Sequence, residues 1–111
     1  MGTISVKGAA VEIDQEGYLA NIDDWNIEVA EHFAENEGIS MSDQHWQIVN
    51  FLRDYYQKYQ IAPMIKILVK EISRKLGPEI GNTKRLYELY PDGPAKQACK
   101  IAGLPKPTGC V

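Results

Sequence analysis

Residues 94–111 read Pro94-Ala95-Lys96-Gln97-Ala98-Cys99-Lys100-Ile101-Ala102-Gly103-Leu104-Pro105-Lys106-Pro107-Thr108-Gly109-Cys110-Val111 and hold both cysteines of the chain. Pro94 suits the first position of a helix, and no Gly or Pro follows it before Gly103, which predicts a short helix carrying Cys99. Gly103 is a natural helix stop, and the two prolines that follow it favour extended geometry. The chain should therefore end in an arm that carries Cys110.

The length of this arm gives it two possible positions. Seven residue steps separate Gly103 from Cys110, enough to carry the thiol roughly 20 Å into another protein's cleft. A disulfide with Cys99 needs Cα atoms about 5.5 Å apart, so the arm would have to fold back, with a bend at Thr108-Gly109. Composition and spacing leave open a third interpretation, a frayed terminus with an idle cysteine.

Cys99 lies in a stripe of small side chains at helical spacing: Ala95, Ala98, Cys99 and Ala102. A backbone segment, such as the folded arm, could lie close against this stripe. Residues 66–111 carry nine basic and four acidic side chains, whereas residues 1–65 carry three basic and eleven acidic ones. We expect this basic half to favour thiolate over thiol and to attract anions such as sulfite, although the α-carboxylate beside Cys110 opposes the effect there.

The totals indicate one soluble domain over residues 1–111, whose net charge is −3. A pair of cysteines without a signal-peptide-like opening predicts a cytoplasmic location. No apolar stretch approaches the ~20 residues that span a bilayer, so we expect no membrane insertion.

Hydrophobic spacing predicts a mostly α (α+β) fold with a β-hairpin region at 1–19, a helical core at 20–103 and an extended, mobile C-terminal arm at 104–111. The predicted strands are 3–6 and 9–13. The first predicted helix starts between residues 21 and 24 and ends at 37. The other four predicted helices span 43–59, 64–76, 82–90 and 94–102. The side chains expected to face inward from the first two are Ile22, Trp25, Val29, Phe33, Trp46, Val49, Leu52, Tyr56 and Tyr59.

Several chemistries have no support. The chain has no Walker loop, no dinucleotide glycine fingerprint and no HExxH motif. His32 and His45 are its only histidines, and we expect both to be ordinary helix residues. Ten residues separate the two cysteines, which is not a usual zinc spacing, so we expect no metal site.

Helices 43–59 and 64–76 could form a helix-turn-helix, with a basic stripe at Lys66, Lys70 and Arg74. The overall acidic charge argues against nucleic-acid binding. The same stripe could instead dock a protein surface.

The most specific run in the chain is Leu86-Tyr87-Glu88-Leu89-Tyr90-Pro91-Asp92-Gly93-Pro94-Ala95-Lys96-Gln97-Ala98-Cys99, continuing through Ala102-Gly103-Leu104-Pro105-Lys106-Pro107 to Cys110. Supporting segments are Glu16-Gly17-Tyr18-Leu19, Glu35-Asn36-Glu37-Gly38-Ile39-Ser40 and Gly81-Asn82. On these residues the chain resembles the DsrC/TusE family of sulfur-trafficking proteins over nearly its whole length. Tyr90 stands where the family pattern has Phe. Members resembling TusE usually keep only the terminal cysteine, so the presence of both Cys99 and Cys110 favours the DsrC branch.

The resemblance implies a sulfur carrier that is a protein co-substrate of dissimilatory sulfite reductase, rather than a stand-alone enzyme. Cys110 would receive sulfur as a persulfide, and Cys99 would close on it to give a trisulfide. The arm would enter the reductase channel near sirohaem, so its partner-binding residues are expected to be Gly103, Leu104, Pro105, Lys106, Pro107, Thr108 and Gly109. Sirohaem and iron–sulfur clusters would belong to the reductase, and we expect no cofactor bound by this chain.

The same resemblance implies further partners. A membrane-bound complex resembling heterodisulfide reductases would reduce the trisulfide. In sulfur oxidisers the direction reverses, and Cys110 would take sulfur from upstream persulfide donor proteins.

Three rival functions stay open. A TusE-like relay for tRNA 2-thiouridine synthesis needs Cys110 alone. A DNA-binding regulator would use residues 43–76. A stand-alone thiol oxidoreductase is disfavoured because the chain has no C-x-x-C pair.

Overall fold

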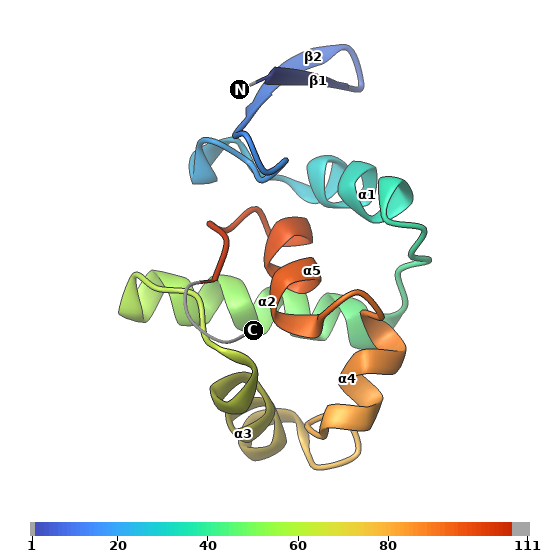
Figure 1. Ribbon diagram of the computed structural model, residues 1–111, viewed down its shortest axis with the longest axis vertical. Coiled ribbons are helices and arrows are strands. Elements are labelled where there is room, and N and C mark those ends of the chain that lie inside the picture. The colour runs from blue at the N-terminus through green and yellow to red at the C-terminus, as the bar shows by residue number, and fades with distance from the viewer. Residues whose placement is uncertain (1, 108–111) are drawn as a thin grey trace.

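The computed structural model describes residues 2–107. In that range a two-stranded antiparallel hairpin precedes a short 3-10 helix and five α-helices, which confirms the predicted fold class (Figure 1). The elements are β1 (Gly2–Val6), β2 (Ala9–Ile13), η1 (Ile22–Asp24), α1 (Ile27–Asn36), α2 (Asp43–Tyr59), α3 (Ile65–Leu76), α4 (Thr83–Leu89) and α5 (Pro94–Ile101).

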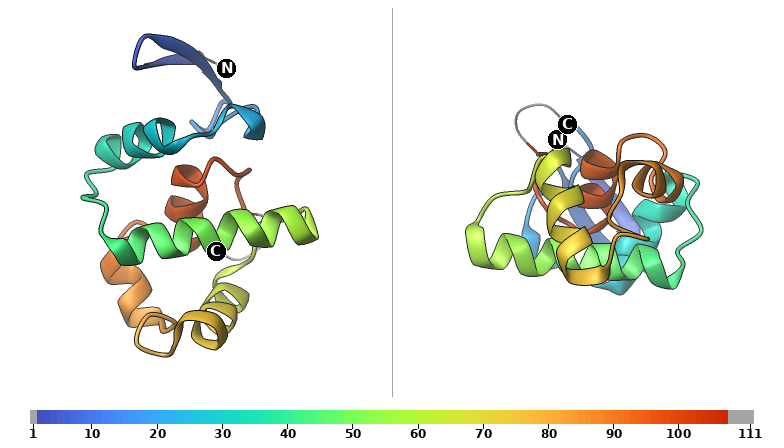
Figure 2. Two further views of the ribbon diagram at one scale, coloured as in Figure 1. Left: turned by 180° about the vertical axis from the view of Figure 1, so that it is seen from behind. Right: turned by 90° about the horizontal axis from the view of Figure 1, so that it is seen from below.

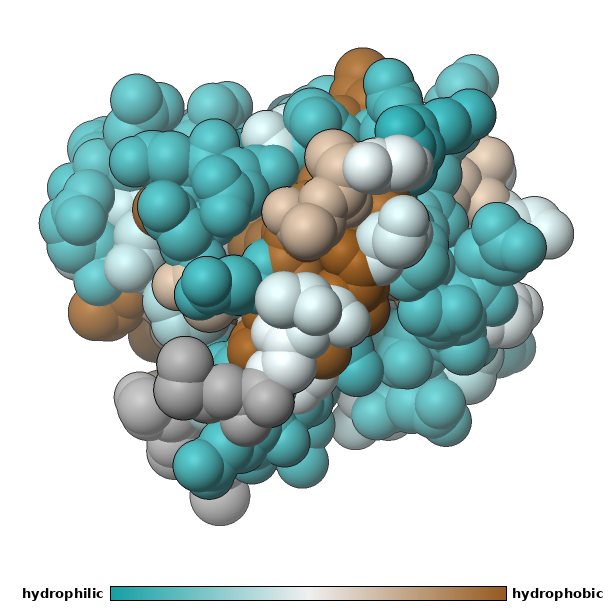
Figure 3. Space-filling view, turned by 90° about the horizontal axis from the view of Figure 1, so that it is seen from above, coloured by the Kyte–Doolittle hydropathy of each residue, from teal (hydrophilic) through white to brown (hydrophobic). Residues whose placement is uncertain are grey.

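The hairpin covers one end of the helical body. Lys7 and Gly8 both have positive φ (51° and 85°), as a tight two-residue hairpin turn requires. Ile4 pairs with Val11 across the strands, and this apolar face of the hairpin faces the body, where β1 contacts α1. Seen from the hairpin end, apolar surface lies at the centre of the face and polar residues surround it (Figure 3).

Side-chain caps decide where three of the helices begin. Asn26, Ser42 and Asn82 each accept a hydrogen bond from the backbone N–H three residues later, at the starts of α1, α2 and α4. Helix α2 has the predicted bounds, and the helix predicted over 82–90 is α4, with Asn82 as its cap.

The first predicted helix is wrong in its N-terminal part. Instead of one helix from residues 21–24 to 37, η1 ends at Asp24 and α1 begins at Ile27. Asn26 is the N-cap residue of α1, so Trp25 lies in extended backbone between the two elements. Its indole is therefore not on the inward face of a helix and can reach α5.

Helix α5 occupies the centre of the bundle and contacts each of the other four α-helices (Figures 1 and 2). The small stripe Ala95, Ala98, Cys99 and Ala102 is completely or almost completely buried. The stripe is therefore part of the core and not an open surface.

The C-terminal end of α2 also differs from the prediction. Tyr59, expected to face inward, is 50% exposed and stacks on Tyr55 with ring centroids 4.6 Å apart. Gln60 then ends the helix in the left-handed region, with φ of 61°. Across the described residues, no helix combines the length and apolar character that crossing a bilayer requires.

Candidate functional site

The root of the arm is a tightly hydrogen-bonded turn. Gly103 adopts φ of +73°; its N–H donates to the Lys100 carbonyl at 3.2 Å, and the Leu104 N–H donates to the Cys99 carbonyl at 3.0 Å. This pair of bonds is the Schellman motif that ends many helices, and it confirms Gly103 as the stop. The chain thus reverses direction, and the arm starts against the backbone of Cys99.

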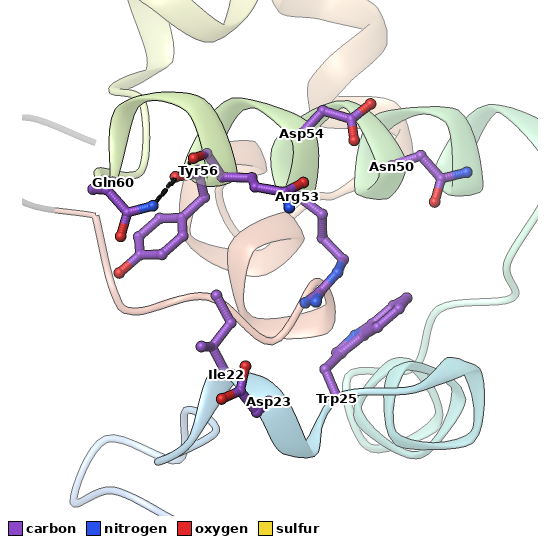
Figure 4. A pocket seen from close by; sticks show the side chains of 9 residues that line it. Ile22, Asp23, Trp25, Asn50, Arg53, Asp54, Tyr56 and Gln60 are labelled. Carbon is purple, nitrogen blue, oxygen red and sulfur yellow. Dashed lines mark hydrogen bonds between the residues drawn. The ribbon is translucent and has the colours of Figure 1, made fainter.

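Two side chains from distant elements bind the last carbonyls of α5. The Trp25 indole N–H donates to the Ile101 carbonyl at 2.9 Å, and the Arg53 guanidinium donates to the Ala102 carbonyl at 2.7 Å. The guanidinium also lies 4.0 Å from the centre of the Trp25 ring, and Figure 4 shows it reaching from α2 toward Trp25. A cation at a helix C-terminus is electrostatically favourable, so this pair holds the arm's root in place.

Sequence reasoning missed this pair. It assigned Trp25 to the core and counted Arg53 only as a charge. The two hydrogen bonds join residues 76 and 49 positions apart, which no local pattern reveals.

Gly103 also makes room for the indole. A Cβ at this position would lie 2.3 Å from a Trp25 ring carbon, far inside contact distance. Glycine is therefore required here for its positive φ and for its lack of a side chain.

The first half of the arm lies on the body. Leu104 and Pro107 are buried, while Pro105 and Lys106 between them are exposed. The Lys106 ammonium contacts the Glu16 carboxylate in the turn after the hairpin. Residues 104–107 of the predicted arm therefore lie against the body.

Three predicted site residues, Thr108, Gly109 and Cys110, lie outside the described residues. Cys110 follows Pro107 by three positions, so chain length alone allows its Cα a distance of up to roughly 10 Å from Pro107.

Cys99 is a free thiol with no solvent exposure. Burial raises its pKa to about 12. The expectation that the basic half favours a thiolate is therefore wrong at Cys99, because burial removes the hydration that a thiolate needs. The nearest lysine on the same helix, Lys100, pairs with Glu37 at 3.6 Å.

Two tyrosines lie near the Cys99 thiol. Burial and then the charge of Cys99 raise the pKa of Tyr18 to about 12, and the same causes raise that of Tyr90 further. The Tyr18 hydroxyl donates to the Lys96 carbonyl at 3.1 Å, so the segment after the hairpin is tied to α5. Sequence reasoning places both tyrosines in the family pattern and does not link either of them to Cys99.

Tyr90, which replaces the family's Phe, has its hydroxyl satisfied. It donates to the His45 carbonyl at 3.0 Å, and the ring nitrogen Nε2 of His45 bonds the Leu89 carbonyl at 2.8 Å. His45 also completes the cap of α2 with Ser42. These contacts give His45 a structural role, as the sequence predicted.

A polar cleft of about 570 Å³ opens beside the arm root, between η1 and the C-terminal half of α2 (Figure 4). It is lined by Ile22, Asp23, Trp25, Asn50, Arg53, Asp54, Tyr56, Gln57 and Gln60. Within residues 2–107, no three His, Cys, Asp or Glu side chains come together as a metal site.

The predicted basic stripe lies on α3, away from Cys99 in sequence and on a different helix. Lys66, Lys70 and Arg74 are all exposed, and Arg74 pairs with Glu71 at 2.7 Å. The structure therefore leaves Lys66 and Lys70 available to a partner.

Comparison with known proteins places this arrangement in a family. Residues 5–111 match the family described as "DsrC like protein". The chain belongs to this family. The sequence is 50% identical over 105 residues to the sulfurtransferase TusE of Escherichia coli K12, covering 95% of this chain and 96% of TusE.

Two solved structures are similar in fold and in sequence. DsrC of Allochromatium vinosum has a TM-score of 0.91 and 54% identity, covering 99% of this chain and 98% of that one. The oxidized gamma-subunit of the dissimilatory sulfite reductase (DsrC) of Archaeoglobus fulgidus has a TM-score of 0.85 and 43% identity, covering 98% and 99%. Identity at this level over almost the whole length supports the same fold and a sulfur-carrier role for this chain.

Proposed function

We propose that this chain is a sulfur carrier and protein co-substrate of dissimilatory sulfite reductase, with Cys110 and Cys99 as its reacting residues. The proposal rests on family membership together with two cysteines: Cys99, buried beside the turn at Gly103, and Cys110, eleven positions later in the sequence. The A. fulgidus relative is named as the reductase's gamma-subunit, which supports the reductase as partner.

The chemistry balances with these two thiols. One sulfite, two thiols, two electrons and four protons give one trisulfide and three waters. The sulfur of sulfite becomes the central atom between Cys110 and Cys99, and the reductase supplies the two electrons. When a persulfide donor is the source, its outer sulfur passes to Cys110, leaving a thiol on the donor and a persulfide on the carrier.

The burial of Cys99 supports an order of events. Cys99 is buried and its pKa is raised to about 12, so its thiol stays protonated and is a poor nucleophile as long as it remains buried. Cys110 takes sulfur first, and Cys99 reacts when the arm brings the loaded sulfur to it. The hydrogen bond from the Leu104 N–H to the Cys99 carbonyl fixes the start of the arm against Cys99, which keeps the return path short.

Single-cysteine variants test the assignment. Cys110→Ser should abolish sulfur loading by the reductase, with sulfite and an electron donor present. Cys99→Ser should still accept sulfur but form no intramolecular trisulfide. Sulfur loading that survives Cys110→Ser would contradict the proposal.

A relay of sulfur to tRNA 2-thiouridine synthesis is the second candidate, favoured by the 50% identity to the E. coli sulfurtransferase TusE. This function needs Cys110 and not Cys99. Complementation of a strain lacking TusE by both wild type and Cys99→Ser, with equal tRNA thiolation, would support it.

The remaining parts of the proposal concern partners and place. A membrane-bound complex resembling heterodisulfide reductases would reduce the trisulfide, and persulfide donor proteins would load Cys110 in the oxidative direction. Sirohaem and iron–sulfur clusters belong to the reductase in this scheme, and the carrier binds neither. We place the carrier in the cytoplasm, because its thiols need a reducing compartment between cycles.

A further inference from the structure

The largest apolar side chains left exposed gather at one corner of the fold. Six large hydrophobic side chains are prominently exposed in the described residues, and four of them fall between residues 59 and 67. We call these four the corner patch: Tyr59 (50% exposed), Ile61 (60%), Met64 (39%) and Ile67 (37%). They cover the last turn of α2, the connecting loop and the first turn of α3.

Lysines flank this patch. Lys58 lies over the Tyr59 ring, with its ammonium 5.4 Å from the ring centre. Lys66 and Lys70 are exposed one turn apart on α3, and Lys70 is one turn from Ile67. From residue 58 to residue 70 the chain has three lysines and no acidic residue. The corner is apolar at its centre and positive at its margin.

The corner lies beside the place where the described arm ends. Every ribbon view sets the end of the arm next to the loop that joins α2 to α3 (Figures 1 and 2). Gln60, inside the corner sequence, lines the same cleft as Arg53 and Trp25, which hold the arm's root. A protein seated on the corner would therefore lie next to Pro107, and Cys110 follows Pro107 by three positions in the sequence.

We propose that the corner patch, with Lys58, Lys66 and Lys70, is a docking surface for the protein that exchanges sulfur with the arm. The matching surface is an apolar seat edged by carboxylates. This inference rests on the proposed carrier function and adds where the partner binds.

The charge and composition of the corner favour a protein over a lipid or a nucleic acid. Tyrosine, isoleucine and methionine around a small charged rim are typical of protein interfaces. Three lysines are few for membrane or nucleic-acid binding. A protein partner needs only a few carboxylates placed beside these lysines.

Kinetics with two sulfur sources test the proposal. The docking variant is Ile61→Ser with Lys70→Glu. Its matched control is Ile27→Ser with Lys84→Glu, since Ile27 is 59% exposed on α1 and Lys84 is an exposed lysine on α4. Each protein is assayed as co-substrate of purified dissimilatory sulfite reductase with sulfite and an electron donor. Each is also loaded directly with inorganic polysulfide, which transfers one sulfur to Cys110 and is left one sulfur shorter.

The docking variant should raise the reductase's KM for the carrier at least about tenfold with little change in kcat, as the loss of two interface contacts implies. The control should stay within about twofold of wild type, and polysulfide should load all three proteins at equal rates. An unchanged KM for the docking variant, or an equal rise for the control, would overturn the docking surface.

Two other results would separate a lipid-binding surface from failure of the carrier function itself. An unchanged KM together with lost binding to phosphatidylglycerol vesicles would refute protein docking and assign the corner to a lipid surface. Wild-type protein that takes sulfur at Cys110 from neither source would refute the carrier function itself.

Discussion

Replacing Gly103 by alanine should destabilise the fold more than any other glycine-to-alanine change at similar φ. The backbone at Gly103 has φ of +73°, and a Cβ there would approach three Trp25 side-chain atoms at 2.3, 2.8 and 2.9 Å. Gly38 provides the matched control, because its φ is +74° and a Cβ added there would meet no atom within 4 Å. Both variants carry the same backbone strain, and only one meets the indole.

The expected loss of unfolding free energy follows from the backbone strain and from the Trp25 contacts that a Cβ at position 103 would break. Backbone strain in the left-handed region costs an alanine about 1–2 kcal/mol. Displacing Trp25 breaks its bond to the Ile101 carbonyl, about 1 kcal/mol, and its stacking with Arg53, about 1 kcal/mol. We therefore expect Gly38→Ala to lower the free energy of unfolding by about 1–2 kcal/mol and Gly103→Ala by about 3–4 kcal/mol.

Urea unfolding followed by circular dichroism measures both variants on the same scale. Equal m-values would show that the difference lies in stability and not in the compactness of the unfolded chain. A difference below about 0.5 kcal/mol between the two variants would refute the reasoning, because it would mean that Trp25 moves aside at no cost.

Four further outcomes follow from contacts at the site. Iodoacetamide at neutral pH should modify Cys110 and spare Cys99 until urea is added, since a pKa of about 12 lowers the thiolate fraction of Cys99 about a thousandfold; equal labelling by mass spectrometry would contradict this. The free energy of unfolding should fall as pH rises from about 9 toward 12, because Cys99 releases a proton in the unfolded chain and retains it in the folded protein. The contribution of Cys99 to this slope approaches about 1.4 kcal/mol per pH unit. Cys99→Ala should remove that contribution. Arg53→Met should cost about 1–3 kcal/mol in urea unfolding by leaving the helix-end carbonyl without its donor, and Arg53→Lys should recover part of that loss. A double-mutant cycle on the exposed Glu16 and Lys106 pair should give a coupling below about 1 kcal/mol, and a larger value would show that this contact dominates the arm's position.

Local signals allowed much of the fold to be predicted from sequence. Ser42 and Asn82 are caps whose hydrogen bonds involve residues only three positions away, so α2 and α4 begin where the sequence indicates. Gly103 stops α5 for an equally local reason, its positive φ. Cys99, Cys110 and the arm were proposed as the site from composition, order and family resemblance, and their roles stay predictions.

The failures share a different cause, which is contact between distant parts of the chain. Trp25 fits a helical spacing with Val29, yet Asn26 takes the cap and the indole binds α5 instead. Cys99 lies in the basic half of the sequence, but its pKa depends on burial by other helices. Tyr59 keeps the helical spacing of the buried side chains of α2, but it is half exposed because no other element of the described residues covers that end of the helix.

The central claim is that Cys110 accepts sulfur first and Cys99 then closes on it. Time-resolved, cysteine-specific mass spectrometry of the wild-type protein, with dissimilatory sulfite reductase, sulfite and an electron donor, tests it most directly. The prediction is one added sulfur that appears early on Cys110, later bridges Cys99 and Cys110, and is released by a thiol reductant. Added sulfur that appears first on Cys99, or two cysteines that stay unmodified while the reductase turns over, would contradict the claim.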